Sequence, residues 1–530
     1  VGVALVAVLI TAGATGWMDL RLARVSETAL SGVRIRAFRH IHDLSMLHQA
    51  SEQRGVLVAR VTSDVDQISR FMQWAGLMLI VNSGQALLAL VVMLVLSPLL
   101  GLVVIALIPL IVVTMWWFQT RLEVAFLTVR EKVGRMLALL AETVVGAPVI
   151  RAYGIEERTR ERLGEAIEDH RSSAVYAGSL SATFSGVGEL LSALVVAAVL
   201  VVGTVLAVHD LTSVGTVLAF LFLVQLFVQP MQMLGEAVNE AQTAVAGWRR
   251  VLDILDIAPD VSDPGPDGVE LPHEPVGASF FGVTFRYPMS GEIAADATGP
   301  AALADLTIDI APRSRVAVVG ETGSGKTTFA KLLTRLMDPS EGWVEVGGAD
   351  LRTVRFDSLR DRVVMVPQEG MLFRGTIGDN VRMGNPDASN AELGAEFHRL
   401  GLGDWLDELT EGIDTPVGER GGALSVGERQ LVTLVRAAIA DPDLLVLDEA
   451  TSAVDPATEV RINRALGELT TGRTVVTIAH RMSTAERADR VLVFDGGKLV
   501  QDGTHEELLA DGGVYQRLYQ SWQTGTSAQT

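Results

Sequence analysis

The sequence predicts an all-α polytopic membrane domain followed by a soluble α/β domain, and three observations carry this prediction. Of the 530 residues, 49 % are hydrophobic and 20 % are charged, so lipid-facing and water-facing parts are joined in one chain. Long apolar runs fall within roughly the first 250 residues. Beyond them, short apolar strand patterns alternate with amphipathic helical patterns, as in an α/β domain.

The overall charge and the cysteine count exclude several classes of function. There are 43 basic and 63 acidic residues, and the formal net charge of −20 argues against nucleic acid as a partner. The chain has no cysteine, which excludes disulfides, thiolate metal sites and cysteine nucleophiles. The same lack of cysteine leaves the redox compartment undecided.

Five apolar runs are candidates for membrane spans. Each approaches the ~20 residues that a bilayer core requires, and they cover residues 1–17, 75–97, 99–118, 183–207 and 211–234. The short links between spans carry no Lys or Arg, whereas the long connections carry many, such as Arg34, Arg130 and Arg249. Because basic residues stay on the cytoplasmic side, the long connections and the C-terminal domain are expected inside. Helical spacing of apolar residues continues through the long connections, so the spans should extend into the cytoplasm.

Five spans whose last end lies inside must begin outside. We therefore expect that a preceding transmembrane helix is missing from this chain, through truncation or because the sequence is part of a longer polypeptide. The alternative is a signal peptide at residues 1–17. It fits less well, because a basic n-region is absent and the segment runs into a long helical pattern.

A phosphate-binding loop follows a predicted strand in the second half of the chain. The strand Arg315 to Val319 precedes "GETGSGKT", which is the complete G-x-x-x-x-G-K-[ST] pattern, and an amphipathic helix comes after it. The glycines let backbone N–H groups approach phosphate oxygens at a helix N-terminus. Lys326 is expected to reach the β- and γ-phosphates, and the Thr327 hydroxyl to ligate Mg²⁺. The expected nucleotide-binding residues of this segment are Gly320, Thr322, Gly323, Ser324, Gly325, Lys326, Thr327 and Thr328.

Two further apolar strand patterns end in side chains suited to phosphate chemistry. The run "LLVLDE" ends in Asp448 and Glu449, and strand alternation lets one hold Mg²⁺ while the other faces an attacking water. Burying two acids there is costly unless cations or donors meet them. The run "RTVVTIAH" ends in His480, which could donate to a γ-phosphate, although a lone histidine at a strand end is more often structural.

These motifs, together with "ALSVGERQL" at residues 423–431, resemble the nucleotide-binding domain of an ATP-binding cassette (ABC) transporter. In the same order along the chain, "VVMVPQ" resembles the family's Q-loop with Gln368, "TPVGERG" its exporter-type X-loop with Glu419, and "SAVD" its D-loop with Asp455. Tyr287 in "VTFRYP" lies where the family stacks an aromatic ring on adenine; the alternative is an ordinary strand tyrosine.

The order of the domains resembles a half-transporter of the exporter type, in the multidrug and lipid-A group. The resemblance implies an all-α polytopic membrane domain followed by an α/β P-loop NTPase (ABC cassette) domain, with the five apolar runs as helices two to six of six. The predicted parts are a transmembrane domain at residues 1–255, a linker at 256–276, a nucleotide-binding domain at 277–523 and a polar tail at 524–530.

In this family two cassettes close head to tail around two ATP molecules, so ATP and Mg²⁺ are the cofactors that the resemblance implies. The signature loop, with Ser425, Gly427 and Glu428, would cap the γ-phosphate held by the other cassette. The implied catalytic residues are Glu449, His480 and Gln368, and the implied Mg²⁺ ligands are Thr327, Gln368 and Asp448. The implied partners are a second ABC half, in a homodimer, a heterodimer or a fused transporter, membrane lipids and a hydrophobic small-molecule substrate.

The signature loop departs from the family's usual L-S-G-G-Q at Val426 and Glu428. In one interpretation the change is harmless, because Ser425, Gly427 and the backbone remain. In the other, the chain is half of an asymmetric pair. The site completed by this loop would then hydrolyse ATP poorly, while Glu449 serves the competent site.

Polar side chains within the spans are the available clue to the substrate, since lipid would leave them unsatisfied. They are Glu189, Gln225, Gln229, Asn82 and Gln85. Interhelical hydrogen bonding explains the amides as well as a translocation path does. A carboxylate within a span is more costly, and Glu189 would suit a cationic amphipath.

The function expected from the resemblance is ATP-driven export of a drug-like, lipid or siderophore-like substrate across the cytoplasmic membrane by alternating access. A lipid flippase or siderophore transporter would use the same ATPase machinery. A non-transporting ABC regulator or channel would typically lack catalytic groups, and here the catalytic residues are present. An importer normally has its membrane and nucleotide-binding parts on separate chains.

Overall fold

The computed structural model describes residues 2–44, 54–288, 298–368, 370–448, 455–479 and 482–527, which form two compact units. The first, called the helical unit below, comprises Val1–Phe38 and Gly55–Asp256. The second, the α/β unit, comprises Arg39–Arg54 and Ile257–Thr530.

Long helices make up the helical unit. They are α1 (Gly2–Asp43, whose last turns belong to the other unit), α3 (Arg54–Val61), α4 (Ser63–Arg70), the π-helix η1 (Phe71–Ala75), α5 (Gly76–Leu96), α6 (Pro98–Val145), α7 (Ala147–Tyr153), α8 (Glu156–Val208) and α9 (Val214–Leu255). Within the described residues, four helical stretches are long and apolar enough to cross a membrane: Leu5–Asp43, Leu57–Leu96, Pro98–Val145 and Glu156–Val208. A shorter apolar helix, Val214–Pro230, starts α9, so most of each predicted run is helical; Ser97 and residues 211–213 of the predicted runs lie outside the helices.

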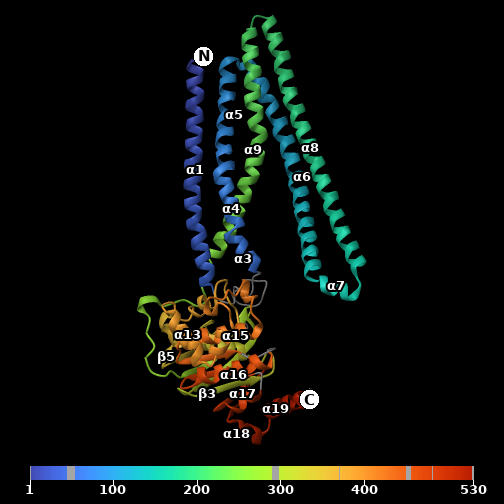
Figure 1. The fold of residues 1–530 in the computed structure, drawn as a ribbon. Helices are drawn as coiled ribbons and strands as arrows, with labels where there is room; N and C mark the ends of the chain where they lie inside the picture. Colours follow the sequence, from blue (N-terminus) through green and yellow to red (C-terminus); the bar gives the residue numbers. More distant parts are fainter. Residues whose placement is uncertain are drawn as a thin grey trace. The chain divides into compact units, whose positions relative to one another are not determined.

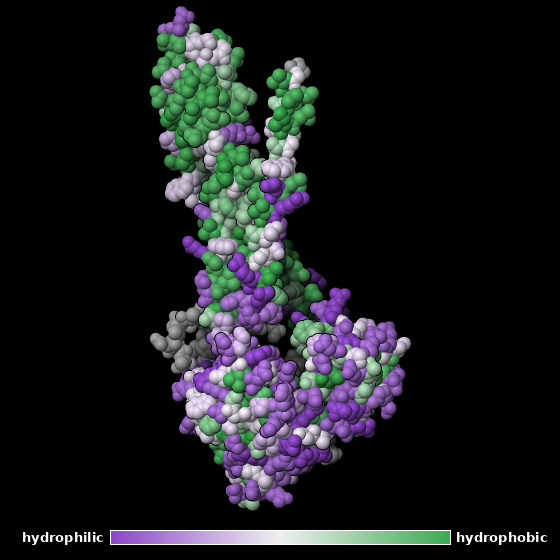
Figure 2. Space-filling view, turned by 90° about the vertical axis from the view of Figure 1, so that its left-hand side faces the viewer, coloured by the Kyte–Doolittle hydropathy of each residue, from purple (hydrophilic) through white to green (hydrophobic). Residues whose placement is uncertain are grey.

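The helices of this unit pack in pairs. Helix α5 pairs with α9 and α6 with α8, and Figure 1 shows α6 and α8 diverging from α5 and α9 toward α7. The four helices share one apolar core, in which Phe220 and Val224 of α9 pack with Met93 of α5 and Val199 of α8. Apolar side chains also cover much of the outer surface of the unit (Figure 2). Such a surface belongs in lipid, because soluble proteins rarely expose contiguous apolar area of this extent.

A half-buried ion pair fixes α4 against the polar end of α9. Arg250 donates from Nε to Asp64 Oδ2 over 2.9 Å and from Nη2 to Asp64 Oδ1 over 2.7 Å. The Asp64 residue is only 6 % exposed. The hydrogen bonds to Asp64 raise the pKa of Arg250 against the effect of burial. A bidentate pair of this kind holds two helices in one register.

Two sheets form the centre of the α/β unit. Their strands are β1 (Ala278–Pro288), β2 (Thr298–Ile310), β3 (Arg315–Gly320), β4 (Glu341–Val346), β5 (Ala349–Asp350), β6 (Val363–Val366), β7 (Leu444–Asp448), β8 (Thr474–Ile478), β9 (Arg490–Asp495) and β10 (Lys498–Gly503). The antiparallel sheet has the order β2-β1-β4-β5, and the second sheet has the order β10-β9-β3-β8-β7-β6. In the second sheet all neighbours are parallel except β10, which pairs antiparallel with β9.

Helices cover both faces of the mostly parallel sheet. They are α10 (Lys326–Leu333), α11 (Phe356–Arg362), α12 (Ile377–Val381), α13 (Asn390–Arg399), α14 (Gly403–Glu408), α15 (Val426–Ile439), α16 (Pro456–Thr470), α17 (Met482–Glu486), α18 (His505–Asp511) and α19 (Val514–Ser527). Alternate residues of β3 enter different cores: Val318 packs with Phe329 of α10, whereas Val319 packs with Tyr515 of α19. This two-residue alternation fixes the register of the central strand between its helical layers.

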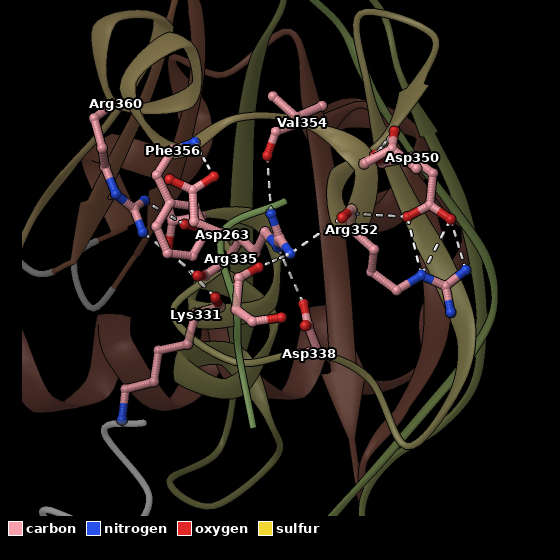
Figure 3. A network of polar contacts seen from close by, with 12 residues as sticks. Asp263, Lys331, Arg335, Asp338, Asp350, Arg352, Val354, Phe356 and Arg360 are labelled. Atoms are coloured by element: carbon pink, nitrogen blue, oxygen red, sulfur yellow. Dashed lines mark hydrogen bonds and ion pairs between the residues drawn. The ribbon is translucent and has the colours of Figure 1, made fainter. Parts of the chain in front are cut away.

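A buried arginine at the end of the α10 segment ties the chain before β1 to the α/β unit (Figure 3). Arg335 is 2 % exposed, and its guanidinium donates to the carbonyl oxygens of Val354 at 3.0 Å, Ser262 at 2.9 Å and Arg352 at 3.3 Å. It also pairs with Asp338 at 3.4 Å, and it lies 5.0 Å from the ring centre of Phe356. One side chain thus joins three separate chain segments.

Replacing Arg335 by leucine is expected to loosen these segments. Three carbonyl oxygens and Asp338 would lose their donor, which should cost about 2–4 kcal/mol of stability. Hydrogen–deuterium exchange of the full chain should show faster exchange at residues 262–271 and 351–356. The control is Arg352→Leu, because Arg352 makes an exposed ion pair with Asp350 that is worth about 0–1 kcal/mol. Equal protection from exchange at these residues in both variants would contradict the role of Arg335 in holding the segments together.

Candidate functional site

Parallel strand ends of the α/β unit meet at a cavity of about 510 Å³. Its lining residues are Tyr287, Ala302, Thr322, Gly323, Gly325, Lys326, Thr327, Thr328, Gln368 and Asp448. The volume is within the range of small-molecule sites, ~300–1,000 Å³. All but Ala302 were predicted from sequence to bind a nucleotide or Mg²⁺, so the fold brings these residues to one place.

The loop between β3 and α10 is built on glycines that no other residue could replace without strain. Gly323 and Gly325 have φ of +85° and +104°, in the region that favours glycine. A Cβ at Gly325 would also lie 2.7 Å from the Ala302 carbonyl oxygen, and one at Gly320 would lie 2.2 Å from the Phe494 carbonyl oxygen. The close approach of neighbouring strands therefore shapes the loop around the cavity.

Lys326 and Ser324 give the loop its capacity for an anion. Lys326 is 5 % exposed, and its Nζ donates to the carbonyl oxygens of Gly320 and Glu321, each at 2.8 Å. Its ammonium thus lies over the loop that leads into the N-terminus of α10, where the helix dipole adds positive potential. The Ser324 Oγ is buried and has no hydrogen-bond partner among the described residues. A buried polar atom of this kind fits a loop that takes a polar ligand.

Oxygen-bearing side chains from two strand ends lie opposite this loop. Asp448 is the last residue of β7, is largely buried, and stands in register with Ile478 of β8. Gln368 follows β6 by two residues, and the Thr327 hydroxyl comes from α10. In the described part of the chain no three His, Cys, Asp or Glu residues cluster as a metal cage. One carboxylate, one hydroxyl and one amide instead suit Mg²⁺, which completes its shell with phosphate oxygens and water.

Tyr287 at the end of β1 adds an aromatic ring to the cavity. Its hydroxyl lies 3.0 Å from Thr328 Oγ1, and its ring packs edge-on against Phe285 at 5.0 Å between centres. The residue remains 38 % exposed, so the ring has a face available at the rim. Ala302 of β2 was not predicted. No local motif marks it, because a long insert separates β2 from the end of β1 in sequence.

The predicted signature loop does not line this cavity and is held by a capping box instead. The Ser425 N–H donates to Glu428 Oε2 at 2.8 Å, and the Glu428 N–H donates to Ser425 Oγ at 3.3 Å. Trp405 Nε1–H donates to the other carboxylate oxygen at 3.3 Å. Burial favours the neutral acid, but these hydrogen bonds together lower the pKa of Glu428. The carboxylate therefore has a structural partner at the start of α15, and Ser425 and Val426 remain exposed.

The other predicted cassette residues have varied positions. Asp455 caps α16 by accepting from the N–H groups of Ala457 and Thr458, and the latter bond in particular lowers the pKa of Asp455. Glu419 is exposed and begins a 3₁₀ helix at Glu419–Gly421. Glu449 and His480 lie outside the described residues.

The polar residues predicted in the spans also differ in environment. Gln85 donates to the Leu226 carbonyl oxygen at 3.2 Å across the α5–α9 contact, so it makes the interhelical bond that was the simpler alternative. Asn82 is buried, with Nδ2 at 3.8 Å from the sulfur of Met78. Gln225 and Gln229 are exposed on α9. Glu189 of α8 lines a separate cavity with residues of α6 and α9.

Comparison with known proteins identifies both units. The family model described as ABC transporter transmembrane region matches residues 1–231, and the model described as ABC transporter matches residues 303–452. A fatty acid ABC transporter ATP-binding/permease protein of Mycobacterium tuberculosis (strain CDC 1551 / Oshkosh) is 33 % identical over 95 % of this chain and 78 % of its own length. The chain belongs to the ABC transporter family.

Other relatives specify the type of ABC transporter. An ATP-dependent lipid A-core flippase of Dechloromonas aromatica (strain RCB) is 32 % identical over 94 % of this chain and 84 % of its own. The structure of a bacterial Atm1-family ABC exporter with ATP bound matches with a TM-score of 0.77 and 26 % identity, over 96 % of this chain and 87 % of that one. The predicted fold class and family are thus confirmed.

Several properties follow from membership of the ABC exporters. The protein is a multi-pass membrane protein with a cytoplasmic ATP-binding domain, and it couples ATP hydrolysis to export. Half-transporters of this kind, with one membrane domain and one cassette per chain, function as dimers.

The capping box predicts different effects for two replacements of Glu428. Glu428→Gln keeps an oxygen acceptor for the Ser425 N–H and should leave ATP turnover within about twofold of wild type. Glu428→Ala removes the acceptor and should destabilise the start of α15 by about 0.5–2 kcal/mol. Thermal unfolding and ATPase assays of the full chain measure both. An unchanged melting point in Glu428→Ala would contradict the structural role.

The same cap has a defined pH dependence. The pKa of Glu428 is lowered from its ordinary 4.5, so its contribution to stability is complete above that value. The contribution is lost as the pH falls through the lower folded-state pKa. The melting-point difference between wild type and Glu428→Ala should therefore be constant near neutral pH and shrink in acid.

Proposed function

We propose that this ABC exporter moves a hydrophobic or amphipathic substrate across the cytoplasmic membrane by alternating access. One observation carries the proposal: the phosphate-loop lysine, the strand-end carboxylate and the rim tyrosine converge on one cavity. The chain that builds this cavity also carries long apolar helices. A nucleotide site and a lipid-facing helical unit on one polypeptide suit transport driven by ATP.

Within the cavity, each residue has a role that follows from its position. The glycine-loop backbone and Lys326 bind the phosphates, and Tyr287 stacks on the adenine. Glu449, directly after Asp448, polarises the attacking water, and His480 steadies the γ-phosphate. Gln368 senses occupation of the site and relays it to the membrane domain.

We assign the Mg²⁺ position to Thr327, Gln368 and Asp448. When bound there, Mg²⁺ supplies charge neutralisation on the β- and γ-phosphate oxygens. Asp448 is suited to this because a buried carboxylate at a strand end gains from a facing cation. The hydroxyl and amide oxygens orient the ion without adding charge.

The signature loop acts on the ATP of a second ABC half. Ser425 and Val426 are exposed and lie outside the cavity of their own cassette, as expected of a segment that meets another subunit. Because Glu428 is engaged by its own helix start and by Trp405, we favour the interpretation in which the departure from L-S-G-G-Q is tolerated. In that interpretation a homodimer of this chain would have two competent sites.

The names of the relatives support a lipid-like substrate class. One relative is a fatty acid transporter and another a lipid A-core flippase, and both are aligned over nearly all of this chain. A flippase and an exporter share the same ATPase steps and differ in where the substrate is released.

Replacing Glu449 by glutamine tests the ATPase assignment. The amide cannot accept a proton, so turnover by the full chain in proteoliposomes should fall at least about 100-fold while nucleotide binding persists. The control is Glu506→Gln, an exposed change on α18 that should leave turnover unchanged. Normal turnover in Glu449→Gln would contradict the role of this carboxylate.

An ATPase assay separates the two interpretations of the signature loop, and a vesicle assay tests the direction of transport. Purified chain alone should hydrolyse ATP at a rate typical of exporters if both sites of a homodimer are competent. Inside-out vesicles should accumulate a labelled amphipath only with ATP. Very slow turnover that recovers when a second ABC half is added would instead establish the asymmetric pair.

A further inference from the structure

A cavity of about 300 Å³ lies among α6, α8 and α9 of the helical unit. Its apolar walls include Ile111 and Met115 of α6, Phe184 of α8 and Val228 of α9. Three residues with polar side chains also line the cavity: Thr114, Ser185 and Glu189. This volume is at the lower end for ligand sites, so it suits a head group or ring with part of a tail.

The cavity lies at membrane depth, near the cytoplasmic boundary of the spans. On α6, the Arg121 guanidinium stacks over Trp117 at 3.7 Å, which is the arrangement of an interfacial aromatic belt. Thr114 lies about one helical turn farther into the apolar run. Phe118 and Phe184, with ring centres 5.5 Å apart, bring α6 and α8 together at this level. A substrate entering from the cytoplasmic side would reach this level early.

A carboxylate such as Glu189 is energetically unfavourable in this apolar setting unless a cation pairs with it. It is the one charged residue in the sequence between 172 and 208, and residues 98–120 of α6 carry no charge. Among the described residues, none forms a hydrogen bond or ion pair with it, and it is exposed. A carboxylate at membrane depth is costly when it lacks a partner, so its presence there points to a ligand or to water.

We infer that this cavity is a substrate subsite that selects amphipaths with a cationic amine head, and that Glu189 is its specificity-determining residue. The inference rests on the proposed export function and names its substrate class. The ammonium would pair with Glu189 and donate hydrogen bonds to the Thr114 and Ser185 hydroxyl oxygens. The Phe184 face adds a cation–π contact, and Met115 adapts to the shape of the tail.

This subsite differs from what the name of one relative would suggest. A fatty acid carries a carboxylate, which the Glu189 carboxylate would repel in a medium of low dielectric constant. None of the residues that line the cavity is basic. The charge of the head group therefore distinguishes the two substrate classes, cationic amphipaths and fatty acids.

Three amphipaths with the same tail test the inference: dodecylammonium, dodecanol and dodecanoate. The full chain in nanodiscs is assayed for ATPase stimulation, with wild type compared with Glu189→Gln and with Glu131→Gln, an exposed change on the cytoplasmic part of α6. We expect dodecylammonium to stimulate wild type at the lowest concentration. Glu189→Gln should raise its half-maximal concentration about tenfold, the loss of one charge-assisted contact. Glu131→Gln should leave that value and the basal turnover unchanged.

The outcomes distinguish this inference from the proposed function. Equal stimulation by all three compounds, unaffected by Glu189→Gln, would overturn the inference and leave amphipath export standing. ATP hydrolysis that no amphipath stimulates, with no amphipath transported into vesicles, would overturn both. If Glu189→Gln weakens the dimer by size-exclusion analysis and leaves the dodecylammonium response intact, the carboxylate serves subunit pairing and the subsite is excluded.

Discussion

The parallel pairing of β3, β6, β7 and β8 is the constraint on which the nucleotide site depends. Because the strands run in one direction, their carboxyl ends meet at one edge, and residues far apart in sequence emerge there together. The register of Asp448 with Ile478 places the carboxylate beside the end of the next strand. A slip of one residue would turn Asp448 to the opposite face and bury the wrong side chains.

The sequence was sufficient for the parts of the site that are local in the chain. The glycine loop, Lys326 and the strand before them form one continuous segment, and each residue type there has a direct physical reason. Ala302 and Arg335 were not foreseen, because their importance comes from contacts between distant segments. The Ala302 carbonyl oxygen of β2 approaches Gly325 of the phosphate-binding loop, which follows β3 in the other sheet. The Arg335 guanidinium donates to carbonyl oxygens that no motif marks.

Glu428 shows how a departure from a family pattern can be explained by local chemistry. Ser425 and Glu428 have the S-x-x-E spacing of a capping box, so this role was readable from the sequence beside the phosphate-binding one. The contact with Trp405, 23 residues earlier, was not readable, because it depends on how α14 packs beside α15. Together these contacts direct the carboxylate to its own helix, and the exposed Ser425 remains available to a partner.

Glu428 and Glu189 carry the same functional group in opposite electrostatic surroundings. At the start of α15, N–H donors and the helix dipole stabilise the charge, so ionisation is favoured without any ligand. Between α6 and α8 the walls are apolar and the described residues supply no cation, so the charge gains most from a ligand that brings its own. The first carboxylate therefore stabilises the fold of one chain. The second, by the same physical reasoning, has its largest effect on the difference in affinity between cationic and anionic amphipaths, which is the quantity that defines transporter specificity.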